Sequence, residues 1–195
     1  MLSRKILRRG ALLLLAAGTA AVTPYLMGEA QEAAIERDLA KGGYVIYLRH
    51  AERKAGPREP FDAATPLAAF TDCEKQRNLT AAGRGEAVRI GQAFQSFSAS
   101  IGDVYALPLC RTRETAQLAI CRAMLEAKLY DPDFVESLLA ESPAPGTNTV
   151  LVDTEDQVRR VAGVALAPGE AAIFQPDGKG GFRYDGMLDQ DDLIR

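Results

Sequence analysis

The chain has a single histidine, His50, which lies in the tetrapeptide Leu48-Arg49-His50-Ala51 directly after the apolar run Tyr44-Val45-Ile46-Tyr47. An imidazole can act as a nucleophile, and the planar guanidinium of Arg49 beside it suits pairing with phosphate oxygens. Open α/β sheets bind their ligands just beyond the carboxyl ends of their strands. This placement predicts a phosphate-handling site, with a core histidine satisfied by hydrogen bonds as the alternative.

Polar residues also follow two further apolar runs. Arg111 comes after the predicted strand 104–107, and Asp153-Thr154-Glu155 comes after the predicted strand 149–152. Because the carboxyl ends of parallel strands lie side by side, we expect two arginines and one imidazole to converge in one crevice. The arginines would stabilise a transferring phosphoryl group, and neutral His50 would accept it. The alternative role for Arg111 is a salt bridge at a helix start, an end that disfavours cations.

Alternating strands and helices must position these residues. Apolar runs predict strands at Tyr44–Leu48, Val104–Leu107, Leu129–Tyr130 and Thr149–Val152, and a hairpin formed by Glu170–Gln175 and Phe182–Tyr184. Helices are expected at Glu29–Ala40, from Thr80 as cap to about Phe97, at about Thr112–Ala127, at Phe134–Ala140 and at Glu155–Ala162. This order predicts a three-layer α/β/α sandwich with a mostly parallel central sheet. The long polar loop Ala51–Asp72 stands where a ligand-enclosing segment would lie.

Residues 1–30 have the features of an export signal. An apolar stretch too short for a confident membrane span, Ala11–Val22, precedes the small-x-small site Gly28-Glu29-Ala30. Four basic residues come before it: Arg4, Lys5, Arg8 and Arg9. The Arg8-Arg9 pair also fits twin-arginine export, and an uncleaved segment would act as an anchor. We therefore expect a signal peptide at 1–30, one domain at 31–195, a periplasmic or secreted location, and membrane contact only through an uncleaved N-terminus.

Charge and cysteine content exclude several classes of partner. The net charge is −3, and loss of the basic first segment makes the remainder more acidic, which argues against nucleic acid as a partner. Cys73, Cys110 and Cys121 fit no zinc pattern, and one histidine with scattered carboxylates makes no recognisable metal site. We expect neither a metal nor a cofactor. In an oxidising compartment one cysteine pair could close, but the sequence does not choose among the three pairings.

Three segments, in order, resemble the successive signatures of the histidine phosphatase superfamily, which has the phosphoglycerate mutase-like fold. They are Tyr44–Ala51, then Gln76–Arg84, then Pro108–Ala116. The resemblance extends through Pro145–Val152 to the tail, and it is closest to small exported members of the phosphoglycerate mutase and SixA-like branch. The run Arg49–Arg53 is also similar to periplasmic phosphatases that act on heptose phosphate of the lipopolysaccharide core.

The resemblance implies that His50 is the phosphorylated nucleophile, that Arg49 and Arg111 bind the phosphoryl group, and that Arg77 or Asn78 lies near the pocket mouth. The implied partner is a small phosphorylated substrate, with a cell-envelope sugar phosphate as one candidate. The general acid stays open. Glu136 stands at roughly the family's acid position, and Glu52 and Glu155 are alternatives near strand ends. The competing interpretation, a solvated carboxylate without a catalytic role, is favoured for each of them.

The sequence departs from the family pattern after the third strand, where Asp153-Thr154 replaces Gly-His. Thr154 can donate one hydroxyl hydrogen bond but carries no charge, and Asp153 would repel an anion unless it points away or is protonated. The serine usual before Pro108 is Leu107 here. Alternatively, Thr154-Glu155-Asp156-Gln157 fits a capping box, so that Thr154 would simply cap the next helix.

Two functions follow from these residues. The first is an exported phosphomonoesterase that works through a phosphohistidine at His50, slowed by the missing second histidine. The second is a pseudophosphatase that binds a phosphorylated ligand or protein without turnover. A mutase is disfavoured because the second histidine matters for moving phosphate between positions on one substrate.

Overall fold

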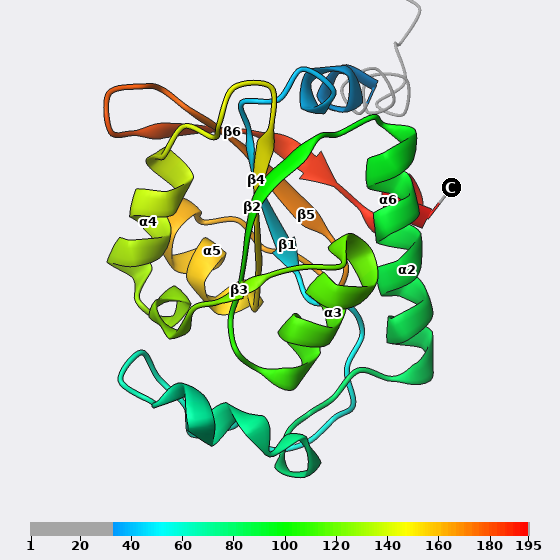
Figure 1. The fold of residues 1–195 in the computed structure, drawn as a ribbon, viewed down its shortest axis with the longest axis vertical. Coiled ribbons are helices and arrows are strands. Elements are labelled where there is room, and N and C mark those ends of the chain that lie inside the picture. The colour runs from blue at the N-terminus through cyan, green and yellow to red at the C-terminus, as the bar shows by residue number, and fades with distance from the viewer. Residues whose placement is uncertain (1–32, 195) are drawn as a thin grey trace, which may run out of the picture.

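A computed structural model describes residues 33–194 of the chain, and its core is a six-stranded sheet with the order β3-β2-β4-β1-β5-β6 (Figure 1). The strands are β1 Val45–Arg49, β2 Ile101–Ala106, β3 Met124–Leu125, β4 Asn148–Asp153, β5 Ala171–Pro176 and β6 Phe182–Leu188. Strands β1 to β4 pair in parallel, and β5 runs antiparallel to both of its neighbours. The expectation of a mostly parallel sheet ending in a hairpin is confirmed.

Helices cover both faces of this sheet and make it the middle of three layers. They are a helix at residues 33–39, α2 Ala81–Ser96, α3 Cys110–Ile120, α4 Pro132–Ala140, α5 Glu155–Ala162 and α6 Gln190–Ile194. One core cluster joins helix 33–39, α2, α3 and α6 to the sheet, and a second joins α4 and α5 to the opposite face (Figure 1). The predicted α/β/α sandwich is thereby confirmed.

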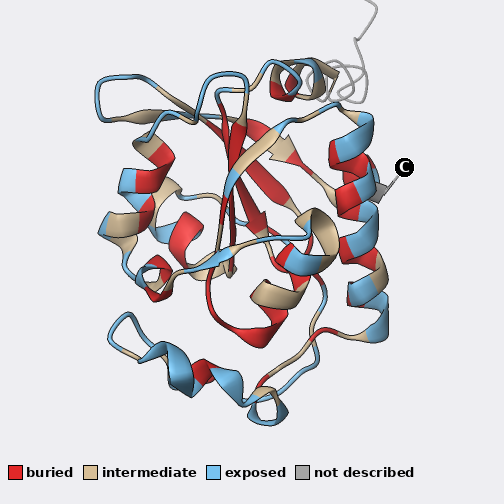
Figure 2. Ribbon diagram, viewed as in Figure 1, coloured by how far each residue is buried: buried red, intermediate tan, exposed pale blue. Residues whose placement is uncertain are grey.

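The central strands are buried on both faces, as Figure 2 shows. In β1, Ile46 and Leu48 enter the first cluster, whereas Val45 and Tyr47 enter the second. Side chains alternate across a strand, and a parallel strand covered on both sides is therefore apolar throughout. This explains why the run before His50 shows no alternation of polar and apolar residues.

The chain after α3 differs from the prediction. Helix α3 ends at Ile120 instead of about Ala127, because Cys121 takes the left-handed conformation with φ of 66°. Met124 and Leu125 then pair with the end of β2, and Ala127–Tyr130 form a 3₁₀ turn where a strand was expected. Helix α6 was not predicted, and its Leu193 is fully buried in the first cluster.

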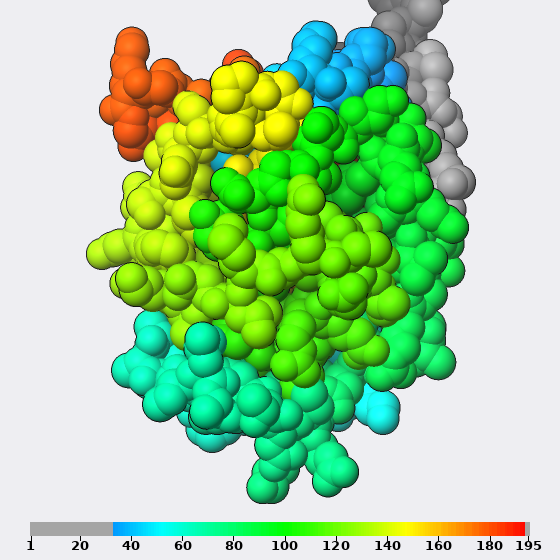
Figure 3. Space-filling view, in the orientation of Figure 1, coloured from blue at the N-terminus to red at the C-terminus, as the bar shows by residue number. Residues whose placement is uncertain are grey.

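Residues 51–79, which we call the cover segment, lie across the carboxyl end of the sheet (Figure 1) and pack against that end of the molecule (Figure 3). The segment contains two 3₁₀ turns, Leu67–Thr71 and Cys73–Lys75, and a bridge between Arg53 and Leu79 joins its two ends. A disulfide between Cys73 and Cys110 fixes it to the start of α3, while Cys121 is free and exposed. The structure thus chooses one of the three pairings that the sequence left open.

No helix in the described range is both long enough and apolar enough to cross a membrane. The predicted signal peptide lies outside the described residues.

Candidate active site

A cavity of about 200 Å³ opens at the carboxyl end of the sheet, beneath the cover segment. Its lining comes from the ends of β1 and β4, the start of α3 and the cover segment, and consists of Arg49, His50, Arg53, Arg58, Glu59, Arg77, Leu109, Arg111, Tyr130, Thr154, Glu155 and Asp156. Five arginines face three carboxylates. With a neutral imidazole, the wall carries two more positive than negative charges in a chain whose overall charge is −3. Such a wall suits an anion.

His50 is held firmly at the inner end of this cavity and is 2% exposed. Its backbone N–H donates to the carbonyl of Asp153 at 2.9 Å, and Nδ1 lies 2.8 Å from the carbonyl oxygen of Ala51. A carbonyl only accepts, so Nδ1 carries the proton and Nε2 keeps its lone pair. The ring is thus in the tautomer that a nucleophile needs.

The surroundings of His50 also keep the ring neutral. Burial and the charges of Arg111 and Arg49 lower the pKa of His50 to about 3, although the hydrogen bond to Ala51 opposes this. A cation cannot attack phosphorus, whereas a neutral ring can. Arg49 and Arg111 therefore have two effects: they attract an anion, and they keep the imidazole of His50 unprotonated.

The peptide after His50 is clamped between α3 and α2. The Ala51 N–H donates to Oγ1 of Thr115 at 3.2 Å, and the Glu52 N–H donates to Glu86 at 2.7 Å. At Gly83 in α2, any Cβ would lie 2.0 Å from the Glu52 carbonyl oxygen. The absence of a side chain at Gly83 lets α2 approach closely and fixes the backbone that orients the His50 ring.

Both predicted phosphate-binding arginines line the cavity. Arg49 donates from Nη1 to Glu155 at 2.8 Å and also to the Leu166 carbonyl. Arg111, which is 3% exposed, donates from Nη1 to Glu59 at 2.9 Å. In the described part of the chain, the Nε atoms of both arginines are buried without a hydrogen-bond partner. Each guanidinium is thus only partly satisfied by protein groups.

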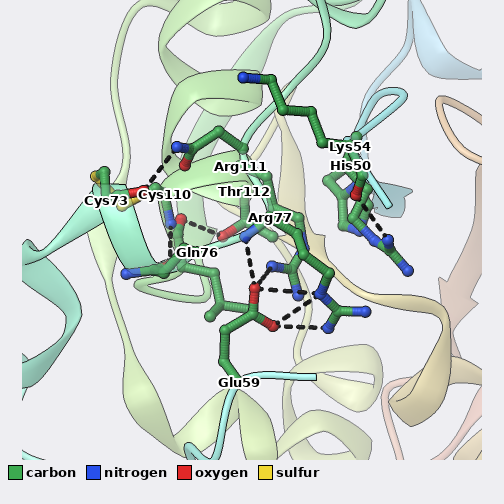
Figure 4. Close-up of polar contacts among 12 residues, drawn as sticks. His50, Lys54, Glu59, Cys73, Gln76, Arg77, Cys110, Arg111 and Thr112 are labelled. Atoms are coloured by element: carbon green, nitrogen blue, oxygen red, sulfur yellow. Dashed lines mark hydrogen bonds and ion pairs between the residues drawn. A yellow bond between two sulfur atoms is a disulfide. The ribbon is translucent and has the colours of Figure 1, made fainter. Parts of the chain in front are cut away.

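Glu59 of the cover segment was not predicted from the sequence, and its carboxylate lies between two guanidiniums (Figure 4). It accepts from Arg77 at Nη2 (2.6 Å) and Nε (3.2 Å), from the Arg77 backbone N–H at 2.8 Å, and from Arg111 at 2.9 Å. Burial alone would raise the pKa of Glu59. The hydrogen bonds from Arg77 and the charge of Arg111 prevail and hold this pKa well below its usual range.

At the end of β4, Thr154 faces the cavity and Asp153 does not. Thr154 stands at the N-cap of α5, but its hydroxyl makes no capping hydrogen bond, so the capping-box interpretation was wrong. Oδ1 of Asp153 instead accepts the Thr154 N–H at 2.6 Å, and Oδ2 lies 2.9 Å from the Tyr47 hydroxyl. Asp153 is fully buried and is absent from the cavity wall, so it points away from a bound anion.

The remaining predicted residues divide into two groups. Arg77 lines the cavity, whereas Asn78 is turned toward the disulfide and donates to the Cys73 carbonyl at 2.7 Å. Two of the candidate general acids, Glu52 and Glu136, do not line the cavity. Glu52 is exposed and accepts from the Thr80 hydroxyl at 2.9 Å, and Glu136 is exposed on α4. Glu155, the third candidate, does line it, paired with Arg49.

Six cavity residues were not predicted as site residues from the sequence: Arg53, Arg58, Glu59, Leu109, Tyr130 and Asp156. The available signal was positional, because the first three lie in the polar loop that was expected to enclose a ligand. Within residues 33–194, no group of three or more histidine, cysteine or acidic side chains is arranged to hold a metal ion.

The architecture and this cavity define an α/β protein of the phosphoglycerate mutase-like type, with a histidine and arginines at the carboxyl end of the sheet. The chain has the fold of the histidine phosphatase superfamily in its SixA-like form. No protein-family model matches the sequence, and a comparison with curated proteins gave no match.

Solved structures show the likeness. SixA from Nakamurella multipartitia is 18% identical over 75% of this chain and 95% of that one, with a TM-score of 0.54. Protein histidine phosphatase SixA complexed with tungstate is 17% identical over 77% and 99%, with a TM-score of 0.51. A mutant phosphoserine phosphatase from Entamoeba histolytica in complex with phosphoserine is 11% identical over 77% and 99%, also with a TM-score of 0.51. Identities this low establish the fold and leave the activity to be argued from the cavity.

Proposed function

We propose that this protein is a phosphomonoesterase that works through a phosphohistidine at His50. One observation carries the proposal: the His50 ring, with Nδ1 2.8 Å from the Ala51 carbonyl oxygen, lies in a cavity that Arg49 and Arg111 also line. The candidate nucleophile His50, its orienting carbonyl at Ala51 and the charged Arg49 are consecutive at the end of β1, and Arg111 joins them from the start of α3.

The chemistry follows from the positions of these groups. The phosphoryl group of a monoester binds against Arg49 and Arg111, whose charges balance those of its oxygens. Nε2 of His50 attacks phosphorus, and the ester oxygen leaves as an alcohol. Water then attacks the phosphohistidine, so that phosphate is released and the neutral ring returns. The Ala51 carbonyl stabilises the positive charge that develops on the ring, since Nδ1–H donates to it throughout.

We further propose that the rate is reduced. Thr154 lines the cavity. We propose that it takes the position of the second histidine that the resemblance implies, and its hydroxyl offers one donor without a positive charge. Loss of one stabilising donor in related chemistry costs about 10²–10³ in rate. A slow enzyme is therefore the expected result, since the nucleophile and both arginines remain.

Location and substrate class belong to the same proposal. The Cys73–Cys110 disulfide supports export to the periplasm or beyond, since such bonds persist in oxidising compartments. The cavity volume of about 200 Å³ suits a small phosphate ester, and a cell-envelope sugar phosphate is our candidate. The phosphoserine bound to the Entamoeba enzyme supports a small substrate on this fold.

The second candidate function is phosphate-ligand binding without turnover. The observation that favours it is again Thr154, because a cavity with an uncharged group at this position can still hold an anion. The two functions differ in whether a bond to His50 forms.

Trapping the phosphohistidine tests the choice. The purified chain is incubated with an aryl phosphate and quenched in alkali, and acid-labile phosphate is located by mass spectrometry alongside a phosphate-release assay. We expect label on His50 and loss of both signals in His50→Ala, with both retained in Arg183→Gln on the distant β5–β6 hairpin. Binding of inorganic phosphate without label or release would establish the pseudophosphatase, and release that survives in His50→Ala would refute the assignment of the nucleophile.

A further inference from the structure

We propose that Glu59 is the general acid of this cavity, and that the arriving phosphoryl group converts it from a carboxylate into a proton donor. The inference rests on the phosphatase function proposed above, and it goes beyond it by assigning the proton that the leaving alcohol requires. Neither Glu136 nor Glu52 can supply that proton from its observed position, because neither lines the cavity.

Three carboxylates line the cavity, and their surroundings differ. Asp156 pairs with Arg58 at 2.9 Å, and both side chains are largely open to solvent, 47% and 63% exposed. Glu155 is divided between Arg49 and Arg159. Glu59 is only 4% exposed and lies against Arg111 from the side of the cover segment. A buried carboxylate in contact with a phosphoryl-binding arginine is the best placed to respond to the ligand.

The charges around Glu59 explain how it would respond. Arg77 and Arg111 contact the carboxylate directly, while Arg53 and Tyr130 lie close enough to interact with it electrostatically. In the free protein the arginines keep Glu59 ionised. A phosphoryl group bound to Arg111 places up to two negative charges beside Glu59. These charges also offset part of the positive potential that the arginines create at Glu59. Burial and like-charge repulsion then both favour the protonated form.

The proton balance closes over the cycle. As the ester binds, Glu59 takes a proton from solvent. Nε2 of His50 bonds to phosphorus, the bond from phosphorus to the ester oxygen breaks, and Glu59 gives its proton to that oxygen to release the alcohol. Glu59, now a carboxylate, accepts a proton from the attacking water, whose oxygen bonds to phosphorus as the bond to Nε2 breaks. Phosphate leaves, and Glu59 loses its proton to solvent again.

The competing role for Glu59 is purely positional, holding Arg77 and Arg111 in place. Leaving groups separate the two roles, because a general acid matters most when the departing oxygen is strongly basic. We therefore compare kcat/KM for an alkyl phosphate and for dinitrophenyl phosphate, since kcat/KM reports the steps through phosphoryl transfer to His50. We expect Glu59→Gln to lose about 10²–10⁴-fold on the alkyl ester and to keep most of its rate on the dinitrophenyl ester.

Controls separate failure of this inference from failure of the proposed function. Glu155→Gln should lower kcat/KM by a similar factor for both esters, because it releases Arg49 without removing the acid. An equal loss on both esters in Glu59→Gln would overturn the assignment and leave Glu59 a positioning residue. If phosphohistidine forms on His50 in wild type, the proposed function stands in either case.

A measurement on the wild type covers the possibility that Glu59→Gln does not fold. Across a series of aryl and alkyl phosphates, a general acid predicts that kcat/KM depends only weakly on the pKa of the leaving alcohol. A steep fall of kcat/KM with rising alcohol pKa would mean that the oxygen leaves unprotonated, and would overturn the inference without any variant.

Discussion

The hydroxyl oxygen of Tyr47 lies 2.9 Å from Oδ2 of Asp153 and 2.7 Å from the carbonyl oxygen of Thr154. A tyrosine has one hydroxyl proton and a carbonyl can only accept, so when Tyr47 donates to Thr154, the proton between Tyr47 and Asp153 belongs to the carboxyl group. Burial raises the pKa of Asp153 to about 7, although the Thr154 N–H and the Tyr47 hydroxyl oppose this when they donate to the ionised carboxylate. Asp153 therefore acts as a structural acid beneath the cavity.

Asp153→Asn should change how stability depends on pH. The folded-state pKa is raised, so between the ordinary value of 3.8 and about 7 the folded protein holds a proton that the unfolded chain has released. Wild-type stability falls across this window as pH rises, and Asn cannot titrate. The free energy of unfolding of the variant minus that of wild type should grow from pH 4 to 7, by up to about 1.4 kcal/mol per pH unit. Urea unfolding at several pH values measures it, and a constant difference would contradict it.

His50→Asn should show the opposite trend. Here the folded-state pKa lies near 3 and the unfolded value near 6.5, so the unfolded chain binds the extra proton within that window. Wild-type stability therefore rises with pH between about 3 and 6.5, while the variant lacks this contribution. Denaturant unfolding of both proteins should show that the free energy of unfolding of wild type, minus that of the variant, increases with pH over this range. Above pH 7 this difference should stay constant. A gain that continues above pH 7 would assign the effect to another group.

Thr154→His should raise the rate. An imidazole at this position adds a donor that can carry a positive charge to the cavity wall, and we expect kcat for an aryl phosphate to increase about 10- to 100-fold. The single substitution is preferable to one that also alters Asp153, because that carboxyl supports Tyr47 and the α5 N-terminus. Thr154→Ala is the matched control and should be no faster than wild type. An unchanged rate in Thr154→His would place the defect elsewhere in the cavity.

Removal of the disulfide should affect both stability and binding. Cys73 and Cys110 are 37 residues apart, and a loop of this length typically contributes about 2–4 kcal/mol. Cys73→Ser with Cys110→Ser should lower the free energy of unfolding by that amount. The double variant should also raise KM, because Arg77 and Arg111 are close in the chain to the two disulfide cysteines. Cys121→Ser, at an exposed free thiol, serves as the control and should change neither quantity. Wild type in reductant should match the double variant.

Much of the scaffold was predictable because its signals are local. Strands β1 and β4 are apolar runs, Thr80 caps α2 by accepting the Gly83 N–H at 2.9 Å, and α5 has the predicted limits. Arg49, His50 and Arg111 could be placed together because parallel topology brings strand ends to one edge. For these elements, the local sequence pattern was enough to predict the observed strand or helix.

The failures occur where contacts outside the recognised local pattern decide the structure. Glu59 is in place because Arg77 and Arg111 bind it and a disulfide holds the cover segment, and no local pattern encodes that. The capping box at Thr154 failed because Asp153, one residue earlier, took the Thr154 N–H. Helix α3 ends at Ile120 because Cys121 takes the left-handed conformation, and the chain then continues to Met124 and Leu125, which pair with β2.

The parallel ladder sets Arg49 opposite Asp153, and the next bond in the series runs from the His50 N–H to the Asp153 carbonyl. Backbone pairing thus holds position 154 beside His50, and this pairing does not involve the side chain at position 154. The scaffold and the chemistry of the cavity wall are therefore separable: a substitution at position 154 changes which group faces the cavity, whereas the backbone pairing that places this residue does not involve its side chain.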